Sequence, residues 1–328
     1  LGRLGSRCQP RAWLRGLCGA QGRVAAGSKT DCGLASAKSA LAYPGLGVRT
    51  VSGVQILAGG VFCDPWPFDS IYLEQWYAAT KPEVFYKASQ YIQPARHTDP
   101  DFGEVMGMRL RLARNDQAVS PLTDFYRTEA RANNDLVPWG TPCTYYWRGV
   151  VGDEFLDLGA GSKVIILQAH DTNLDFVGRF PTFDGAIEES ELVLRFSRDS
   201  VPTGEVVYRK PLTPRAPIEI TMQIMWADDY HVSGSQGWYR IYDGDALVAE
   251  GSGLNTWLDP DGSSEPWCPF QKWGVYQAGY NYAWWQGKAM NMIYSAAFTA
   301  AGSVSPAQCR AHTAERLTAN RASRIGVL

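Results

Sequence analysis

The chain has 328 residues, 45% of them hydrophobic, with 12 Trp, 16 Tyr, 12 Phe and a net charge of −2. This length can bury a full core, as one large domain or two smaller ones. No apolar run approaches the roughly 18 residues of a membrane helix, so we expect a soluble chain without a membrane span. Abundant Gly, Pro and aromatic residues are typical of β-rich globular proteins.

The charge is unevenly distributed. Residues 1–50 carry +7 and residues 303–328 carry +3, which leaves −12 for residues 51–302. An acidic body argues against nucleic acid as a partner. It would also repel an anionic polymer at long range, and local Arg and Lys side chains with salt screening would offset that repulsion.

These differences divide the chain into three parts. Residues 1–50 form a basic arm rich in Gly and Ala, which lacks the apolar segment of a secretory signal and resembles a transit peptide, an anchoring arm or an extension. Residues 51–302 form the folded body. Residues 303–328 form a basic tail with a short helix at 305–319. The basic ends also suggest a homo-oligomer or a larger assembly formed through the arm.

A short helix is expected between Asp69 and Thr80, and the rest of the body has the pattern of β-strands. In residues 218–226 large apolar side chains occupy every second position, which predicts one buried face. Many short strands with frequent turn residues predict an all-β fold, a jelly-roll (concanavalin-like) sandwich of two sheets with a concave groove and few short helices. The expected strands are 106–112, 125–131, 144–151, 163–170, 191–196, 205–208, 218–226, 237–242, 246–249, 270–277 and 289–299.

Three of these strands carry polar side chains at every second position, which puts them on one face of each strand. Gly274, within the third set, leaves a gap where a ligand or another backbone can approach. Together the sets predict one sheet with a polar, titratable concave face. They are Arg127, Glu129 and Arg131; Gln168 and His170; and Lys272, Gly274 and Tyr276.

An Arg, a Gln, a His and a Tyr on one face suit β-elimination on a uronic-acid polysaccharide. Arg127 and Gln168 would neutralise the sugar carboxylate, which makes the C5 proton more acidic and stabilises the enolate-like charge. His170 or Tyr276 would take this proton, and Tyr276 would protonate the leaving oxygen. Because an ordinary Tyr has a pKa of about 10, its use as a base requires nearby cations such as Arg127 or Lys272.

Other interpretations of the same residues stay open. Acyl transfer lacks a serine nucleophile with its base, and glycoside hydrolysis needs two facing carboxylates where only Glu129 is well placed. Taken singly, the Arg-Glu-Arg set also fits a salt-bridge ladder on a solvated face. His170 alone fits a structural histidine, and Tyr276 alone fits an ordinary strand aromatic.

The three sets, in this order, resemble the motifs of a known family. Residues 127–131 (RTEAR) resemble the R-[ST]-E-L-R strand of alginate lyases with a β-jelly-roll fold. Residues 168–170 (QAH) resemble their Q-[IV]-H, and residues 270–276 (FQKWGVY) resemble their Y-F-K-A-G-x-Y. Glucuronan lyases and other uronate lyases share this plan. The resemblance covers residues 100–300 and leaves residues 1–50 unexplained.

The resemblance implies a role for each matching residue in a polysaccharide lyase. Arg127 and Gln168 would neutralise the carboxylate, His170 would be a base or the partner of one, and Tyr276 would be the acid and also a candidate base. Ala130, Ala169 and Trp273 depart from the family pattern, so the polymer stays open among alginate, glucuronan and similar polyuronates. The supporting or substrate-binding residues would be Glu129, Arg131, Lys272 and Gln277.

The family would place the protein outside the cell, as a secreted enzyme acting on an anionic polysaccharide. The alternative is a non-catalytic carbohydrate-binding or structural protein, for example a component of a virion or surface appendage, that keeps the lyase-like sandwich. This alternative is motivated by the basic ends, and it predicts a regular assembly in which residues 1–50 are ordered against a neighbour.

No cofactor is expected from the sequence. The acidic segment 259–265 resembles part of a calcium loop through Asp259, Asp261 and Glu265, but it lacks the full ligand pattern. The seven Cys are an odd number without a CxxC, which argues against zinc. Disulfides and buried free thiols both stay open for these cysteines.

Overall fold

A computed structural model describes residues 53–61, 71–76, 92–113, 125–132, 137–158, 161–170, 181–196, 204–227, 236–253, 268–278 and 289–325. The chain divides into two units, Leu1–Gly47 and Val48–Leu328, and every described residue belongs to the second. The basic arm 1–50 and the calcium candidate Asp259, Asp261 and Glu265 lie outside the described residues.

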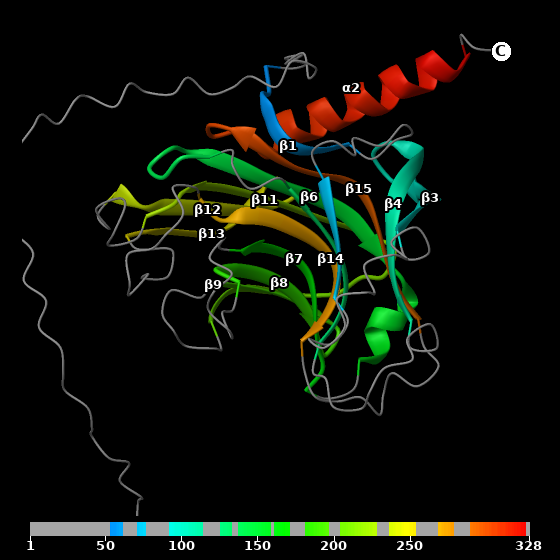
Figure 1. Ribbon diagram of the computed structural model, residues 1–328, viewed down its shortest axis with the longest axis horizontal. Coiled ribbons are helices and arrows are strands. Elements are labelled where there is room, and N and C mark those ends of the chain that lie inside the picture. The colour runs from blue at the N-terminus through cyan, green and yellow to red at the C-terminus, as the bar shows by residue number, and fades with distance from the viewer. Residues whose placement is uncertain are drawn as a thin grey trace, which may run out of the picture. The chain divides into compact units, whose positions relative to one another are not determined.

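The described strands form two antiparallel sheets that stack as a β-sandwich (Figure 1). This confirms the all-β jelly-roll class that the sequence predicts. The first sheet has the order β13 (Ala246–Ser252), β12 (Trp238–Asp243), β11 (Pro217–Met225), β6 (Cys143–Val151), β15 (Ala289–Ala301), β4 (Gly103–Ala113) and β3 (Ile92–Asp99), with β1 (Ile56–Val61) also paired to β15. The second has the order β10 (Glu205–Pro211), β9 (Glu191–Phe196), β8 (Phe183–Glu188), β7 (Lys163–His170), β14 (Phe270–Ala278), β5 (Phe125–Ala132) and β2 (Ile71–Trp76).

The main core lies between the inner faces of the two sheets. The alternation in residues 218–226 is confirmed, since every apolar residue of that face is buried in this core. Trp147 and Trp226 enter the core from the first sheet, and Trp273 enters it from the second. The strands of both sheets bend in the same sense, so the second sheet lies on the inner side of the curve (Figure 1). Its outward face is therefore the concave one.

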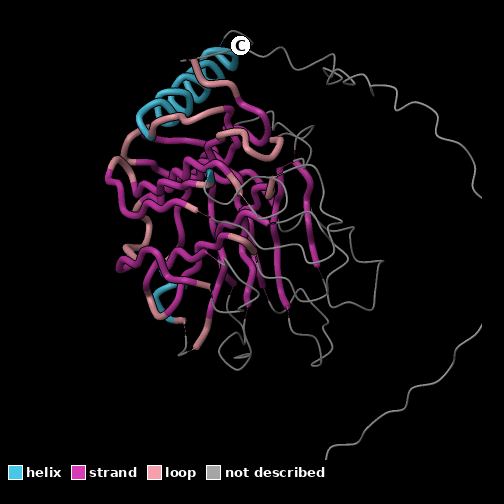
Figure 2. Tube along the Cα trace, turned by 90° about the vertical axis from the view of Figure 1, so that its left-hand side faces the viewer, coloured by secondary structure: helices cyan, strands magenta, loops and turns pink. Residues whose placement is uncertain are grey.

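A C-terminal helix, α2 (Pro306–Ile325), lies on the outer side of the first sheet (Figure 2). Its start follows the capping-box pattern, because Ser305 Oγ accepts a hydrogen bond from the Gln308 N–H and the Gln308 side chain accepts one from the Ser305 N–H. Cys309 and Leu317 of α2 pack in a second, smaller core on that outer face. A 3-10 helix, η4 (Asp153–Asp157), follows β6.

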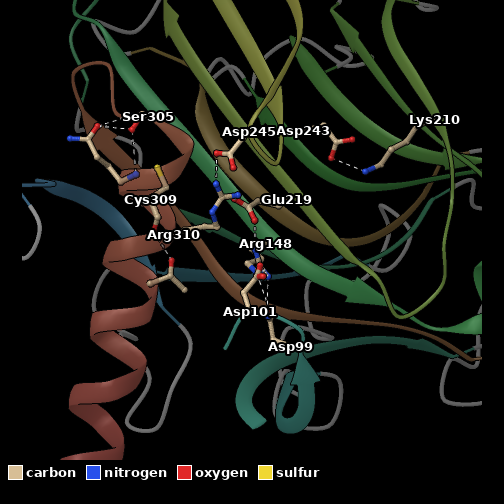
Figure 3. A network of polar contacts seen from close by, with 12 residues as sticks. Asp99, Asp101, Arg148, Lys210, Glu219, Asp243, Asp245, Ser305, Cys309 and Arg310 are labelled. Carbon is tan, nitrogen blue, oxygen red and sulfur yellow. Dashed lines mark hydrogen bonds and ion pairs between the residues drawn. The ribbon is translucent and has the colours of Figure 1, made fainter. Parts of the chain in front are cut away.

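A buried ion network joins α2 to this outer face (Figure 3). Arg148 on β6 is almost fully buried and binds Asp99 through two hydrogen bonds of 2.7 and 2.8 Å. The same guanidinium binds Asp101 and Glu219, and Arg310 of α2 binds Glu219 at 3.1 Å. Burial acts to raise the pKa of Asp99, but the hydrogen bonds and charge of Arg148 outweigh it, so this pKa lies below its ordinary value.

Several elements differ from the sequence-based expectation. Residues 71–76, within the segment expected to be helical, form strand β2, which pairs with β5. This segment has mixed helix and strand propensity, and pairing with β5 at the sheet edge overrides the weak local preference. Strands β3 and β8 were not expected, and α2 is longer than the predicted helix at 305–319.

Candidate active site

The three polar sets lie on adjacent strands of the second sheet, in the order β7, β14, β5. Tyr276 is the cross-strand partner of Arg127, and Lys272 is the partner of both Arg131 and Gln168. His170 pairs with Phe270 at the end of β7. The alternate positions of β14, Trp273 and Val275, pack in the core, so the polar sets occupy the outward, concave face. The expectation of one shared polar face is confirmed at the level of register.

Two register shifts, one on β14 and one on β7, accompany this alignment of the polar positions. The register shifts between Trp273 and Tyr276 opposite β7, and it shifts again on β7 between Ile165 and Leu167 opposite β8. Tyr294, from the opposite sheet, binds both strands at this point: its hydroxyl accepts a hydrogen bond from the Gly274 N–H at 3.0 Å and donates one to the Ile166 carbonyl. One buried phenol therefore satisfies backbone groups that the bulge removes from the ladder.

The inner side of β14 is fixed by further hydrogen bonds from β6. Trp147 Nε1 donates to the Lys272 carbonyl at 3.1 Å, and the Gln271 side chain donates to the Tyr146 carbonyl at 2.9 Å. Tyr145 donates to the carbonyl of Pro269, directly before the strand, at 2.5 Å. Hydrogen bonds from β6 thus fix the inner side of the strand that carries Lys272 and Tyr276, which limits the movement of its outward side chains.

On the concave face, Gln168 and Glu129 form the central polar contact. Gln168 Nε2 donates a hydrogen bond to Glu129 Oε1, and both side chains are almost fully buried. Gln168 Oε1 has no hydrogen-bond partner. The Lys272 ammonium lies 5.3 Å from the centroid of the Phe270 ring, and the His170 ring lies 5.9 Å from the same centroid. Burial strengthens each polar contact here, because little water screens it.

The structure adds a polar group that the sequence interpretation missed. Asp184 on β8 is the cross-strand partner of Gln168, and Arg195 on β9 is the partner of Asp184. Lys163 donates to Asp184 at 3.0 Å, and Arg195 binds Glu188. Burial raises the pKa of Asp184 despite the opposing charges of Lys163 and Arg195. The alternation of Asp184, Ala186 and Glu188 was a signal for this strand.

Register corrects one predicted substrate-binding position, Gln277, and places an unexpected acidic residue, Glu74, beside Glu129. Gln277 pairs with Val164, a core residue, so this position lies on the opposite face from Tyr276. Glu74 on β2 is the cross-strand partner of Glu129. The missed strand β2 thus brings a second acidic position beside the one that the sequence identified.

The remaining titratable groups lie elsewhere. His97 Nε2 is 3.0 Å from Ser295 Oγ in the first sheet, but Ser295 is fully buried and Asp99 is bound to Arg148, so these residues do not form a usable nucleophile with its base. Across the described ranges, no group of His, Cys, Asp and Glu could hold a metal ion. The three described cysteines, Cys143, Cys268 and Cys309, are buried thiols outside any disulfide. None of the helices described is long and apolar enough to cross a membrane.

No family model and no curated protein matches the sequence. Among solved structures, the chain is similar to an endo-β-1,4-glucuronan lyase from the fungus Trichoderma reesei, with 15% identity and a TM-score of 0.46 over 70% of this chain and 94% of that chain. Alginate lyase A1-II', of polysaccharide lyase family 7, has 15% identity and a TM-score of 0.43 over 66% and 85%. A GH131 β-glucanase catalytic domain from Podospora anserina has 12% identity and a TM-score of 0.46 over 71% and 86%. These neighbours include lyases and a glucanase, so they describe a fold and not one reaction.

Proposed function

We propose that the protein is a polysaccharide lyase that cleaves a uronic-acid polymer by β-elimination. The observation that carries this proposal is the register of β5, β14 and β7, in which Arg127 pairs with Tyr276 and Gln168 pairs with Lys272. These positions are remote in sequence, and their convergence on one face is the arrangement that the reaction requires.

The carboxylate of the sugar would be neutralised first. Gln168 uses one N–H in its bond to Glu129, which fixes the amide and leaves a second N–H and Oε1 for the substrate. Arg127 would add a fixed positive charge. Neutralisation makes the C5 proton more acidic, and the same groups stabilise the enolate-like charge that develops.

Proton transfer and bond cleavage would follow. His170 or the Tyr276 phenolate would take the C5 proton, the electron pair would form the C4–C5 double bond, and the C4–O bond would break. Tyr276 would protonate the leaving oxygen. The Lys272 ammonium lies on the same face and would favour the charged forms of both substrate and phenolate.

The test is to incubate the full chain with alginate, glucuronan, polygalacturonate and hyaluronan while following the ultraviolet absorbance of the unsaturated product. We expect absorbance to rise with at least one polymer and to fall to background in Tyr276→Phe. A flat trace on all four polymers, from protein that is folded by circular dichroism, would contradict the proposal.

Glycoside hydrolysis is a second candidate, and the pairing of Glu74 with Glu129 favours it. Cross-strand partners have Cβ atoms about 4.5–5.5 Å apart, which is compatible with the roughly 5–5.5 Å between the carboxyl groups of a retaining glycosidase. A hydrolase would release new reducing ends without ultraviolet absorbance, and Glu74→Gln would abolish that release. The two reactions are therefore separated by the same incubation.

A further inference from the structure

The polar row on the concave face continues beyond the residues assigned to the proposed reaction. From Gln168 it passes through Asp184 and Arg195 to Val206 on β10, each the cross-strand partner of the one before. Cross-strand partners share a face of the sheet, so all four project from the concave side. Two strand spacings, roughly 9.5 Å, separate the backbone at Gln168 from that at Arg195.

Three atoms of successive residues in this row are buried without a hydrogen-bond partner: Gln168 Oε1, Asp184 Oδ1 and Arg195 Nη1. Their residues are 1%, 3% and 8% exposed. Arg195 Nη1 lies 3.7 Å from Asp184 Oδ1, which is too long for a hydrogen bond. Buried polar atoms in native proteins normally have partners, so two acceptors beside one donor indicate a ligand that both donates and accepts.

The charges around these atoms define the class of ligand. Lys163 and Arg195 are balanced by Asp184 and Glu188, with which they form ion pairs. A second carboxylate would meet two acidic groups, whereas hydroxyl groups can donate to Asp184 and accept from Arg195 without adding charge. Val206, 44% exposed at the open end of the row, offers an apolar surface for the C–H face of a sugar ring.

We propose that Asp184, Arg195 and Val206 form a second sugar subsite that binds the vicinal hydroxyls of the unit next to the one at Gln168. The inference rests on the proposed polysaccharide function. The subsite recognises hydroxyl groups and not a carboxylate, so the protein would bind one acidic unit at the reacting centre and recognise the next unit by its hydroxyls. Polymers in which a uronate is followed by a neutral sugar therefore belong to its substrate class.

The experiment is isothermal titration calorimetry of the full chain with cellotetraose, a neutral oligosaccharide that cannot undergo β-elimination. We expect millimolar or tighter binding by the wild type. Arg195→Met removes the donor and weakens binding roughly tenfold or more, because Asp184 and the ligand hydroxyl lose a charge-assisted partner. Val206→Ser, at an exposed position that does not threaten folding, weakens it about threefold.

Two control variants make the outcome specific. Lys210→Gln removes an ion pair of 2.7 Å to Asp243 from the opposite face of the same edge strand, and it should leave binding unchanged. Tyr276→Phe should abolish elimination of uronate polymers, a readout that does not depend on cellotetraose binding. The subsite and the lyase proposal can thus fail separately. The absence of heat with wild type, or wild-type affinity in both Val206→Ser and Arg195→Met, would overturn the subsite.

Discussion

Gln168 on β7 and Glu129 on β5 are joined by a side-chain hydrogen bond although β14 lies between their strands. The contact crosses β14 on the face where Gly274, the register partner of Glu129, has no side chain. The gap expected at this glycine is thus spanned by two polar side chains. This bond orients the amide that the proposed reaction uses to neutralise the substrate carboxylate.

Glu129→Ala should therefore act through Gln168. The buried amide would lose its acceptor, which we expect to lower the free energy of unfolding by about 1–3 kcal/mol. On a cleaved polymer, kcat/KM should fall roughly tenfold or more. Urea denaturation and initial rates measure the two effects. Glu129→Gln keeps an acceptor oxygen and should recover most of the activity, and equal losses in both variants would contradict a positioning role.

Tyr294→Phe tests the support beneath the site. Burial raises the pKa of Tyr294 well above 10, so its hydroxyl stays protonated and can donate to Ile166 while accepting from Gly274. Its removal should lower the free energy of unfolding by about 1–3 kcal/mol, because two backbone groups in the bulge lose their partner. Tyr242→Phe, on β12, is the control and should change stability by less than about 0.5 kcal/mol. Equal stability of the two variants would argue against a support role.

The sequence predicted the buried strands and the polar sets well, for a local reason. Alternation is a property of neighbouring residues. The inner face of residues 218–226 and the outward positions 272, 274 and 276 could therefore be predicted from the sequence. Strand β2 was expected to be helical because its strand conformation depends on pairing with β5, which local preference does not encode. The ion network at Arg148 could not be predicted, because its members lie in remote parts of the chain. Asp99 and Glu219 bind Arg148, and Arg310 binds Glu219.

The ion network at Arg148 predicts a pH-dependent stability. The pKa of Asp99 is lower in the folded protein than its ordinary 3.8, so the stability it contributes is present above that value and is lost as pH falls through the folded pKa. Asp99→Asn should cost about 3–5 kcal/mol near neutral pH, because Arg148 stays buried with less compensation. The difference from wild type should shrink below about pH 3.8.

Urea denaturation of both proteins across this pH range measures the effect. Glu219 has the opposite sign, since burial raises its pKa above the ordinary 4.5 and its protonation favours the folded state. Because Glu219 binds the same guanidinium as Asp99, its titration is coupled to the substitution, and making the comparison in a Glu219→Gln background removes it. A difference that stays constant from neutral pH into the acid range would exclude Asp99 as the titrating group.

The described cysteines should resist modification in the folded protein. Burial raises the pKa of Cys143 and of Cys309 to about 12, so almost no thiolate is present at neutral pH. Peptide mapping after iodoacetamide treatment should find both residues unmodified in buffer and alkylated in urea. Modification of either at the same rate under the two conditions would contradict their burial.

The mass of the product end group tests the central proposal most directly. A polyuronate digested by the full chain should yield oligosaccharides one water molecule lighter than hydrolysis products, because elimination leaves a C4–C5 double bond. Tyr276→Phe should lower kcat roughly 100-fold or more, and Gln168→Ala should lower kcat/KM, with both proteins folded. Products of full hydrolytic mass, or undiminished elimination by Tyr276→Phe, would contradict the account.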